Sequence, residues 1–332
     1  NNFCTYCIVP YTRDRERYRS AAEIIDETAR WVASGTREIT LLGQTVDSYR
    51  DPTLSRSDSQ TLPPAASDDP DESQFPALLR AIATRVPNLR RLRYTSPHPR
   101  HLTQALIDAH RDLDILAQHV HMPAQSGSDR MLKRMIRRYT RAEYTERVRR
   151  LLAARPGMTV STDIIVGFPG ETEEDFAATL DLVRDIGFTG LFGFKYSPRP
   201  YTPALKLPDD VSEEEKSERL ARLFEVCEAQ TRAHLQTFVG TKQEVLIEGP
   251  GKSTGMWEGR TIRNEIVHVR LPESTVDRDR LGESLSGEIV EVDVVEAFKH
   301  SLAAVLTDAA IAKLPKSPAA ARPPRRRRAL PL

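Results

Sequence analysis

The sequence predicts an α/β domain with a parallel sheet, either a barrel or a doubly wound sheet, followed by a small all-β domain. Five β-prone segments alternate with helical patterns as far as Tyr196. A long, charged helical pattern then leads away from this region. Short alternating strands separated by glycines begin near Gly240, which is typical of a small barrel or sandwich.

Caps mark the helices of the first domain. Ser20 and Glu23 form a capping box, and the helix that they open is expected to end at Gly35. Thr140 and Thr172 open two later helices, and Gly187 ends the second of them. Two further helices are predicted over 75–86 and 102–110. The strands predicted between the helices span 38–42, 89–94, 116–122, 158–166 and 190–196.

The rest of the chain divides by composition. Residues 1–238 form the predicted first domain, which ends in a helix over 212–237, and residues 51–74 within it are rich in Ser, Asp and Pro, as in a flexible surface insertion. The all-β domain is predicted over 239–308, with strands at 243–248, 265–270, 288–296 and 302–307. Residues 309–332, with an arginine run at 325–328, are predicted to be a disordered basic tail.

Composition excludes several classes of protein. Hydrophobic residues make up 39% of the 332 residues and charged residues 29%, which suits a packed core. A formal net charge of +1 does not by itself indicate nucleic-acid binding, so any positively charged binding surface must be confined to part of the protein. Three cysteines form no disulfide framework, and no apolar run approaches the roughly 20 residues that span a bilayer. We therefore expect a cytoplasmic protein without a membrane anchor.

Cys4 and Cys7, spaced C-x2-C, are the clearest candidates for chemistry. They are a pair of buried thiols, half of a zinc site, or two ligands of a larger metal centre, because two thiolates do not complete a site. Cys227 lies in a predicted helix far along the chain and is expected to pack there. Because Asn1 is not an initiator methionine, the chain is expected to be a piece of a longer protein.

The segment from Asn1 to Cys7 resembles the end of the C-x3-C-x2-C signature of radical S-adenosylmethionine enzymes. The resemblance implies a [4Fe-4S] cluster held by three thiolates, with Cys4 and Cys7 as two of them and the first just before Asn1. The open iron then binds S-adenosylmethionine, and Tyr6 lies beside its adenine. The fold that it implies is a partial (β/α) radical SAM barrel.

Further segments are similar to the methylthiotransferase branch, and within it to the MiaB-type enzymes that act on tRNA; they are residues 7–13, 41–49, 125–128, 135–140, 163–172 and 196–199. The resemblance implies conversion of N6-isopentenyladenosine next to the tRNA anticodon to its 2-methylthio form. One S-adenosylmethionine provides the methyl group and another is reductively cleaved. Rival members of the branch modify an aspartate of a ribosomal protein or threonylcarbamoyladenosine in tRNA.

By the same resemblance, several residues are expected to bind S-adenosylmethionine; they are Tyr6, Gly43, Gln44, Ser126, Ser161, Asp163 and Arg199. Arg199 has the clearest physical case, because a guanidinium pairs with a carboxylate through two hydrogen bonds. Glycines in such segments more often only form tight turns, and a carboxylate such as Asp163 can also be a cap. The all-β domain resembles the RNA-binding TRAM module, with Lys242, Arg260 and Arg263 as candidate phosphate contacts.

Two departures concern glycines of the family, which are Asp14 and Tyr201 here. The family's N-terminal domain, with a second [4Fe-4S] cluster, and the first barrel strand have no counterpart in this sequence. We therefore expect these 332 residues alone to be an inactive, RNA-binding fragment. For the full protein the resemblance implies a monomer that acts on tRNA and receives electrons from a donor such as flavodoxin or ferredoxin.

Overall fold

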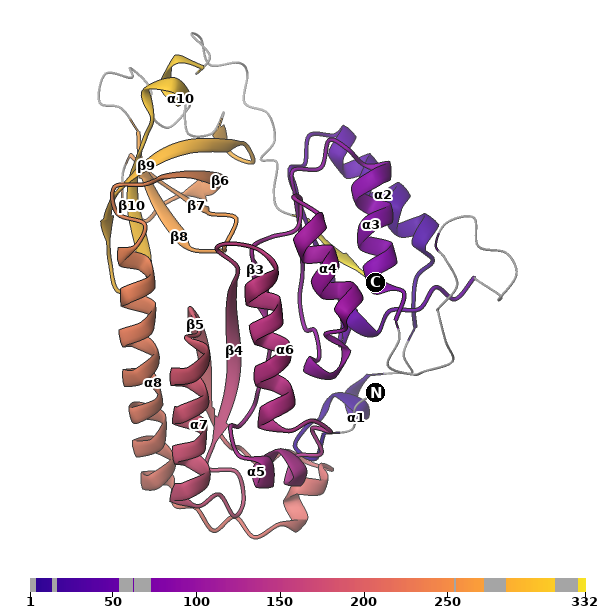
Figure 1. The fold of residues 1–332 in the computed structure, drawn as a ribbon, viewed down its shortest axis with the longest axis vertical. Coiled ribbons are helices and arrows are strands. Elements are labelled where there is room, and N and C mark those ends of the chain that lie inside the picture. Colours follow the sequence, from indigo (N-terminus) through magenta and orange to yellow (C-terminus); the bar gives the residue numbers. More distant parts are fainter. Residues whose placement is uncertain are drawn as a thin grey trace.

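The computed structural model describes residues 4–13, 17–53, 62, 73–253, 255–271, 285–313 and 328–332. A layered α/β core and a separate β-barrel are joined by one long helix (Figure 1). The core elements are α1 (Val9–Thr12), α2 (Ala21–Ala33), β1 (Glu38–Leu42), η1 (Val46–Ser48), α3 (Phe75–Arg85), β2 (Arg91–Tyr94), η2 (Pro99–His101), α4 (Gln104–Asp112), β3 (His119–His121), α5 (Asp129–Arg134), α6 (Arg141–Ala154), β4 (Thr159–Val166), α7 (Glu173–Ile186), β5 (Gly190–Lys195), η3 (Pro203–Lys206) and α8 (Glu213–Gln236).

The remaining elements are β6 (Lys242–Pro250), β7 (Met256–Arg260), β8 (Ile266–Arg270), β9 (Ile289–Ala297), β10 (Ser301–Leu306), α10 (Asp308–Ala312) and β11 (Arg328–Pro331). Every predicted core strand and helix is present, with shifts of a few residues at the ends. The capping boxes at Ser20, Thr140 and Thr172 are all formed, and Gly187 ends α7 with a φ of 70°.

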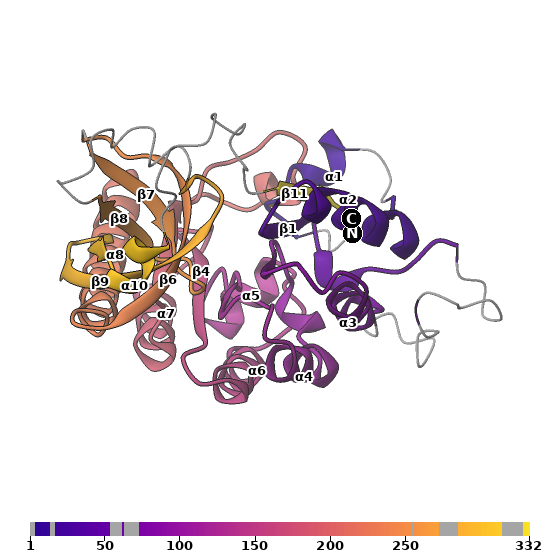
Figure 2. The same ribbon diagram turned by 90° about the horizontal axis from the view of Figure 1, so that it is seen from above.

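The core strands form two parallel sheets, with orders β11-β1-β2 and β3-β4-β5. An isolated parallel bridge between Leu92 and Leu116 connects them, so the six strands follow one another around a partial barrel. The helices cover the outside in the order α2, α3, α4, α6, α7 and α8, each packed against the next, and Figure 2 shows this layer from above. The predicted parallel α/β fold is confirmed.

Alternating residues of the core strands have opposite environments, as the strand period requires. Ile39, Leu92 and Ile164 belong to the large hydrophobic cluster that the helices cover. On the other face the strands carry polar or charged side chains, including His119 and Asp163. The inside of the partial barrel therefore carries polar side chains, beside which Phe192 packs against His121, and these polar groups suit a site for a polar ligand.

The C-terminal domain is a closed barrel with strand order β10-β8-β7-β6-β9 and its own hydrophobic cluster, which includes Trp257 and Val267. The prediction missed β7, because its glycines suggested turns. Gly259 instead lies inside this strand, where a Cβ atom would come within 2.4 Å of the carbonyl oxygen of Leu246. Glycine is needed there because two backbones approach closely within a small barrel.

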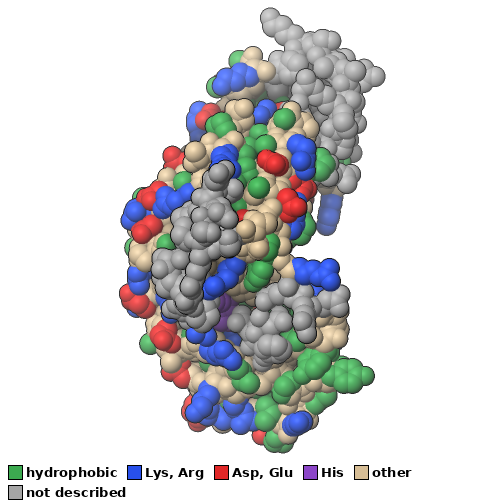
Figure 3. All heavy atoms as spheres, turned by 90° about the vertical axis from the view of Figure 1, so that its right-hand side faces the viewer, with side chains coloured by type: hydrophobic (Ala, Val, Ile, Leu, Met, Phe, Trp, Pro, Cys, Tyr) green, Lys and Arg blue, Asp and Glu red, His purple; other side chains and the backbone are tan. Residues whose placement is uncertain are grey.

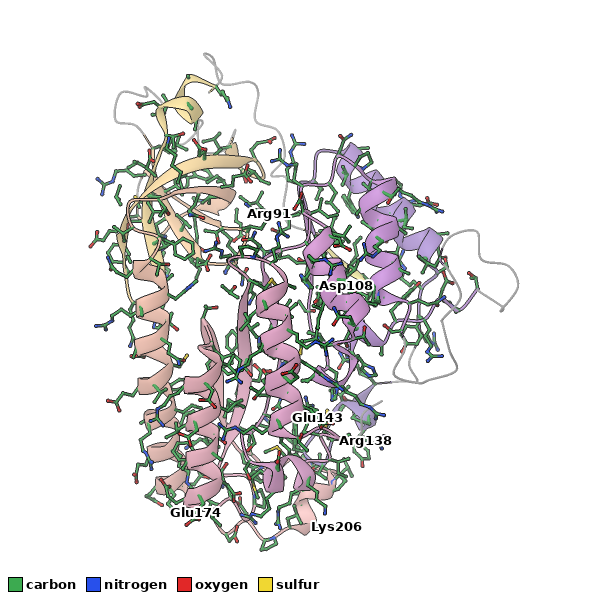
Figure 4. All side chains as sticks on the ribbon, viewed as in Figure 1. Arg91, Asp108, Arg138, Glu143, Glu174 and Lys206 are labelled. Carbon is green, nitrogen blue, oxygen red and sulfur yellow. The ribbon has the colours of Figure 1, made fainter. Side chains whose placement is uncertain are left out.

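The β-barrel packs against the end of the core where the core strands begin. Arg91, at the start of β2, donates to the carbonyl oxygens of Arg260 at 2.9 Å and Glu244 at 2.8 Å. Arg93 donates to the carbonyl oxygen of Thr261 at 2.8 Å and contacts Glu38 at 3.0 Å. Figure 4 labels Arg91 at this junction. The carboxyl ends of the core strands therefore lie at the opposite end from the β-barrel.

The prediction of a disordered tail over 309–332 is wrong for the parts that the structure describes. Residues up to Ala312 complete the short helix α10, and β11 pairs in parallel with β1, with Leu330 buried in the core cluster. Apolar burial against an open sheet edge outweighs the low complexity of this segment. Residues 314–327 lie outside the described part of the chain.

The predicted flexible insertion also lies largely outside the described residues, which include only positions 51–53, 62, 73 and 74 of it. Asp51 and Gln74 are buried and joined by a hydrogen bond of 2.9 Å from the Asp51 amide to the Gln74 side chain. No helix among the described residues has both the length and the apolar character needed to cross a membrane.

Candidate functional site

The segment Cys4–Cys7, called the cysteine loop below, lies at the carboxyl ends of the core strands. Two neighbouring segments hold it in place. The Thr5 amide donates to the carbonyl oxygen of Met135 at 3.1 Å, and the Thr5 hydroxyl donates to that of Arg134 at 3.0 Å. On the other side the Ala204 amide donates to the carbonyl oxygen of Thr5 at 3.0 Å. These bonds fix the loop between the end of α5 and the start of η3, so the two thiols have a defined position.

A cavity of about 200 Å³ opens beside this loop. Cys4 and Cys7 line the cavity together with Gln44, which follows β1, and Asp163, which lies in the middle of β4. Burial raises the pKa of the Cys7 thiol. Tyr6, between the two cysteines, also lines the cavity and packs edge-on against Phe168 at a ring-centroid distance of 6.4 Å. Residues far apart in sequence thus meet at one cavity at the strand ends.

Arg137 is the cation of this site. Its guanidinium is buried and lies 3.4 Å from the Cys4 sulfur, 2.9 Å from the Tyr139 hydroxyl and 3.2 Å from the carbonyl oxygen of Pro123. Within the described part of the chain no carboxylate pairs with it. A buried guanidinium without a carboxylate is costly, so its charge favours an anionic group in the cavity.

The residues of this cavity suit an iron–sulfur cluster. Cluster iron is bound by thiolates, and hydrogen bonds to the sulfurs together with nearby charge set the cluster's properties. Cys4 and Cys7 provide two sulfurs, and Arg137 provides both a hydrogen bond to sulfur and a compensating charge. The described residues contain no group of three or more His, Cys, Asp and Glu side chains that could hold a metal ion. Cys4 and Cys7 alone therefore do not make up a complete metal site among the described residues.

A chain of hydrogen bonds leads from the barrel interior to the cavity. His119 Nε2 and His121 Nδ1 lie 3.0 and 2.8 Å from the Ser161 hydroxyl, and His121 Nε2 lies 3.1 Å from the Asp163 carboxylate. Burial lowers the pKa of His119 to about 3, so this ring is neutral. When His121 donates to Asp163, Ser161 donates to His121 and accepts from His119. The chain therefore holds the Asp163 carboxylate in place.

The structure brings together some of the predicted cofactor-binding residues and separates others. Tyr6, Gln44 and Asp163 line the cavity with the cysteines, and Gly43 lines an adjoining cavity of about 560 Å³ that Gln44 shares. Ser161 faces the two histidines instead. Ser126 is buried beside Thr179, 3.4 Å between hydroxyl oxygens, and Arg199 is exposed. For all seven residues cofactor binding stays a prediction.

Among the cavity residues that were not predicted as site residues, three have ionisable side chains: His98, His121 and Arg137. His98 follows β2, and its amide donates to both carboxylate oxygens of the buried Asp47 at 2.9 Å. The rule that sites form after strand ends would have found His98. Arg137 sits in a loop after α5, and only tertiary folding brings it to Cys4.

The candidate RNA contacts of the β-barrel are unequal in exposure. Arg263 stacks over the Phe238 ring at 5.3 Å and donates to the Gln118 side chain at 3.3 Å, within the junction with the core. Arg260 donates to Glu248 at 3.3 Å and to the carbonyl oxygen of Asn264 at 3.1 Å. Lys242 is exposed, with its amine 3.9 Å from Glu291. Of the three, Lys242 has the most freedom to contact phosphate.

Residues 1–183, more than half of the chain, match the radical SAM superfamily. The chain belongs to the radical SAM superfamily. Membership implies a [4Fe-4S] cluster and S-adenosylmethionine, in agreement with the two thiols and the cation in the cavity. Residues 236–307 match the TRAM domain, which corresponds to the β-barrel at the other end of the core.

The chain is also similar to curated proteins named tRNA-2-methylthio-N(6)-dimethylallyladenosine synthase. It is 60% identical over 340 residues to the one from Sorangium cellulosum, covering 99% of this chain and 66% of that protein. It is 41% identical to the one from Desulfosudis oleivorans and 43% identical to the one from Geobacter sulfurreducens, covering 92% and 91% of this chain. The chain spans 66%, 63% and 62% of the lengths of these relatives.

Solved structures with a similar arrangement include a methylornithine synthase and the coproporphyrinogen III oxidase from Escherichia coli. Their TM-scores are 0.42 and 0.43, both at 16% identity. The matches cover 68% and 64% of this chain, and 59% and 46% of those chains.

Proposed function

We propose that the full-length protein is a radical SAM methylthiotransferase that converts N6-isopentenyladenosine next to the tRNA anticodon to its 2-methylthio derivative. The observation that carries the proposal is the cavity where Cys4, Cys7, Gln44 and Asp163 meet, in a chain 60% identical to a relative with this named activity. The relatives' printed name, which refers to tRNA, supports a tRNA substrate rather than a ribosomal protein.

The aromatic C–H bond at position 2 of the adenine is unreactive, and a [4Fe-4S] cluster with S-adenosylmethionine supplies the hydrogen abstraction that it requires. The chain's own residues hold these groups. Cys4 and Cys7 provide sulfur ligands, and Arg137 compensates their negative charge. Asp163 and Gln44 face the same cavity with groups that can bind the amino and carboxylate parts of a methionine. Tyr6 offers an apolar ring for the adenine.

The finer parts of the proposal concern the full-length protein. A second [4Fe-4S] cluster, in a domain outside this chain, delivers the sulfur. Flavodoxin or ferredoxin delivers electrons, and the protein works as a monomer in the cytoplasm. The domain division at residue 238 is supported by the end of α8 at Gln236 and the start of β6 at Lys242.

The test is mass spectrometry of tRNA nucleosides from a strain that lacks the full gene. We expect 2-methylthio-N6-isopentenyladenosine to disappear and the unmodified N6-isopentenyladenosine to accumulate. The full gene should restore the modification, whereas Cys4→Ala and Cys7→Ala should not. A Cys227→Ala variant is the matched control, because this cysteine packs in α8. Unchanged 2-methylthio nucleoside in the deletion strain contradicts the proposal.

Residues 1–332 alone are expected to hold no stable cluster. Cys4 and Cys7 are the two thiols at the cavity, and the third cysteine of the sequence, Cys227, is buried in α8. Two thiolates leave iron sites without protein ligands. Anaerobic reconstitution followed by iron counting measures this directly, and four irons per chain would contradict the expectation.

A further inference from the structure

Two exposed tyrosines lie beside each other at the rim of the cysteine loop. Tyr11, in α1, and Tyr201, in the loop after β5, are 54% and 78% exposed. Their ring centroids are 6.4 Å apart and the rings are tilted by 37°. A single exposed aromatic ring needs no explanation, but two adjacent exposed rings form an apolar surface whose burial is favourable. The pair therefore calls for a ligand with an aromatic or apolar face.

The pair is placed firmly at the mouth of the candidate site. Tyr11 lies four residues after Cys7, in the short helix α1. Val9 and Pro10 of the same helix line the cavity. Three residues after Tyr201, the Ala204 amide is bound to the carbonyl oxygen of Thr5 in the cysteine loop. A ligand held by the two rings thus lies next to whatever occupies the cavity.

The backbone at Tyr201 gives a second, independent observation. Its φ is 67°, in the left-handed region where glycine is free of strain and a side chain is not. The loop would adopt this conformation more easily with glycine. A fully presented aromatic ring at a strained position indicates that the ring itself has a role.

The charge around the pair identifies the kind of ligand. Arg13 and Arg199 each lie two residues from one of the tyrosines and are exposed, and neither pairs with a carboxylate in the part of the chain that is described. Figure 3 draws the face of the molecule that lies on the right-hand side of Figure 1. Hydrophobic side chains gather near the lower end of that face, with Lys and Arg side chains beside them. Aromatic rings flanked by free cations are the composition that binds single-stranded nucleic acid.

The β-barrel does not provide these contacts near the site. It packs at the opposite end of the core, and Arg260 and Arg263 are engaged in bonds within the protein. Among the described residues, those at the mouth are the ones placed to contact RNA that reaches the cavity.

We propose that Tyr11 and Tyr201 form a stacking platform for an unpaired base of the substrate RNA loop, with Arg13 and Arg199 contacting the adjoining phosphates. This inference rests on the proposed function and adds the position of the RNA loop at the mouth. Stacking on an aromatic side chain is tolerant of base identity, so the platform positions the loop rather than reading its sequence.

The test measures the affinity of the full-length protein for a fluorescein-labelled RNA hairpin whose loop contains N6-isopentenyladenosine, by fluorescence anisotropy. Tyr201→Gly is expected to weaken binding about tenfold, the effect of losing one base stack, and Tyr11→Ala by a similar factor. Tyr201→Phe keeps the ring and should bind like the wild type. Because Tyr201→Gly relieves the backbone strain, loss of folding does not explain weaker binding; a thermal melt verifies this.

Phe224→Ala is the control, since Phe224 is an aromatic of α8, 36% exposed, that belongs neither to the mouth nor to the TRAM match. Hairpins with one abasic loop position at a time locate the stacked base: at that position Tyr201→Gly should cause no further loss. If the wild type binds no hairpin, the proposed RNA substrate is wrong. If the wild type binds but Tyr201→Gly and Tyr11→Ala bind equally well, the platform is refuted and the rings contact another surface, such as protein.

Discussion

Arg137 illustrates what a single side chain contributes to the candidate site. It is buried, it donates to the Cys4 sulfur at 3.4 Å, and it has no carboxylate partner among the residues described. A positive charge close to a cluster stabilises the reduced form, which carries one more electron. We therefore expect Arg137 to affect the reduction potential of a cluster bound at this site without being an iron ligand.

Replacing Arg137 by Met in the full-length protein should therefore shift the reduction potential of the cluster to more negative values. Electron paramagnetic resonance during a redox titration measures the shift. Arg138→Met serves as the control, since Arg138 is the exposed neighbour (Figure 4). Equal potentials in the wild type and Arg137→Met would show that the guanidinium does not act on the cluster.

His110 is a second single residue with a predictable effect, because it makes the stability of the fold depend on pH. It is buried, and its Nε2 lies 2.7 Å from the Tyr94 hydroxyl. Burial, followed by repulsion from Arg155, lowers the pKa of His110 from 6.5 to about 3. The unfolded state therefore binds a proton first when the pH falls below about 6.5. Stability is lost as the pH falls from there toward 3, because protonation favours the unfolded chain.

We expect the free energy of unfolding, measured with urea, to be lower at pH 5 than at pH 7. His110 contributes at most about 1.4 kcal/mol per pH unit below 6.5. A His110→Gln variant should show a smaller difference between the two pH values, whereas His300→Gln, at an exposed position, should behave like the wild type. An unchanged pH dependence in His110→Gln would assign the acid sensitivity to other groups.

At the scale of elements, glycines separate into those that only turn the chain and those that permit close packing. At Gly127, after β3, a Cβ atom would lie 2.4 Å from the carbonyl oxygen of Ala178 and 2.6 Å from the Thr179 Cα atom, both in α7. At Gly187, which ends α7, a Cβ atom meets nothing within 4 Å, but φ is 70°. From sequence, both positions suggest turns.

Gly127→Ala should consequently destabilise the core by about 1–3 kcal/mol through overpacking, because α7 must move as a unit. Gly187→Ala should cost about 1–2 kcal/mol from backbone strain alone. Hydrogen exchange distinguishes the two: Gly127→Ala is expected to raise exchange throughout α7, and Gly187→Ala only at its end. Identical exchange patterns would contradict this distinction.

At the scale of the whole molecule, the core and β-barrel are joined by charged side chains that donate to backbone oxygens. Arg91 donates to the carbonyl oxygens of Arg260 and Glu244, and Arg37 contacts Glu288 at 3.2 Å. Removing the Arg91 side chain leaves these two partly buried carbonyl oxygens without their donor and takes one ion-pair partner from the buried Glu38 carboxylate. The junction, rather than either hydrophobic core, is therefore the point at which the two parts can separate.

An Arg91→Met variant is expected to lose about 2–4 kcal/mol, the cost of leaving buried polar groups unpaired. Calorimetry should then resolve two unfolding transitions where the wild type has one. Arg90→Met is the control, because the exposed Arg90 makes only a distant 3.5 Å contact with Glu244. A single transition at an unchanged temperature in Arg91→Met would mean that other contacts hold the junction.

The sequence by itself determined the main helices and strands of the core, the parallel α/β class and the pair of cysteines, because capping residues, periodicity and spacing are local signals. It also placed Gln44 after a strand and Asp163 within one. Only the tertiary structure decided that Arg137 reaches Cys4, that Ser161 turns to two histidines, and that Arg263 is enclosed at a junction. These contacts join residues more than 20 positions apart, and no local pattern encodes such distances. The pairing of β11 with β1 also depends on the tertiary structure, because it is stabilised by burial of Leu330 in the core.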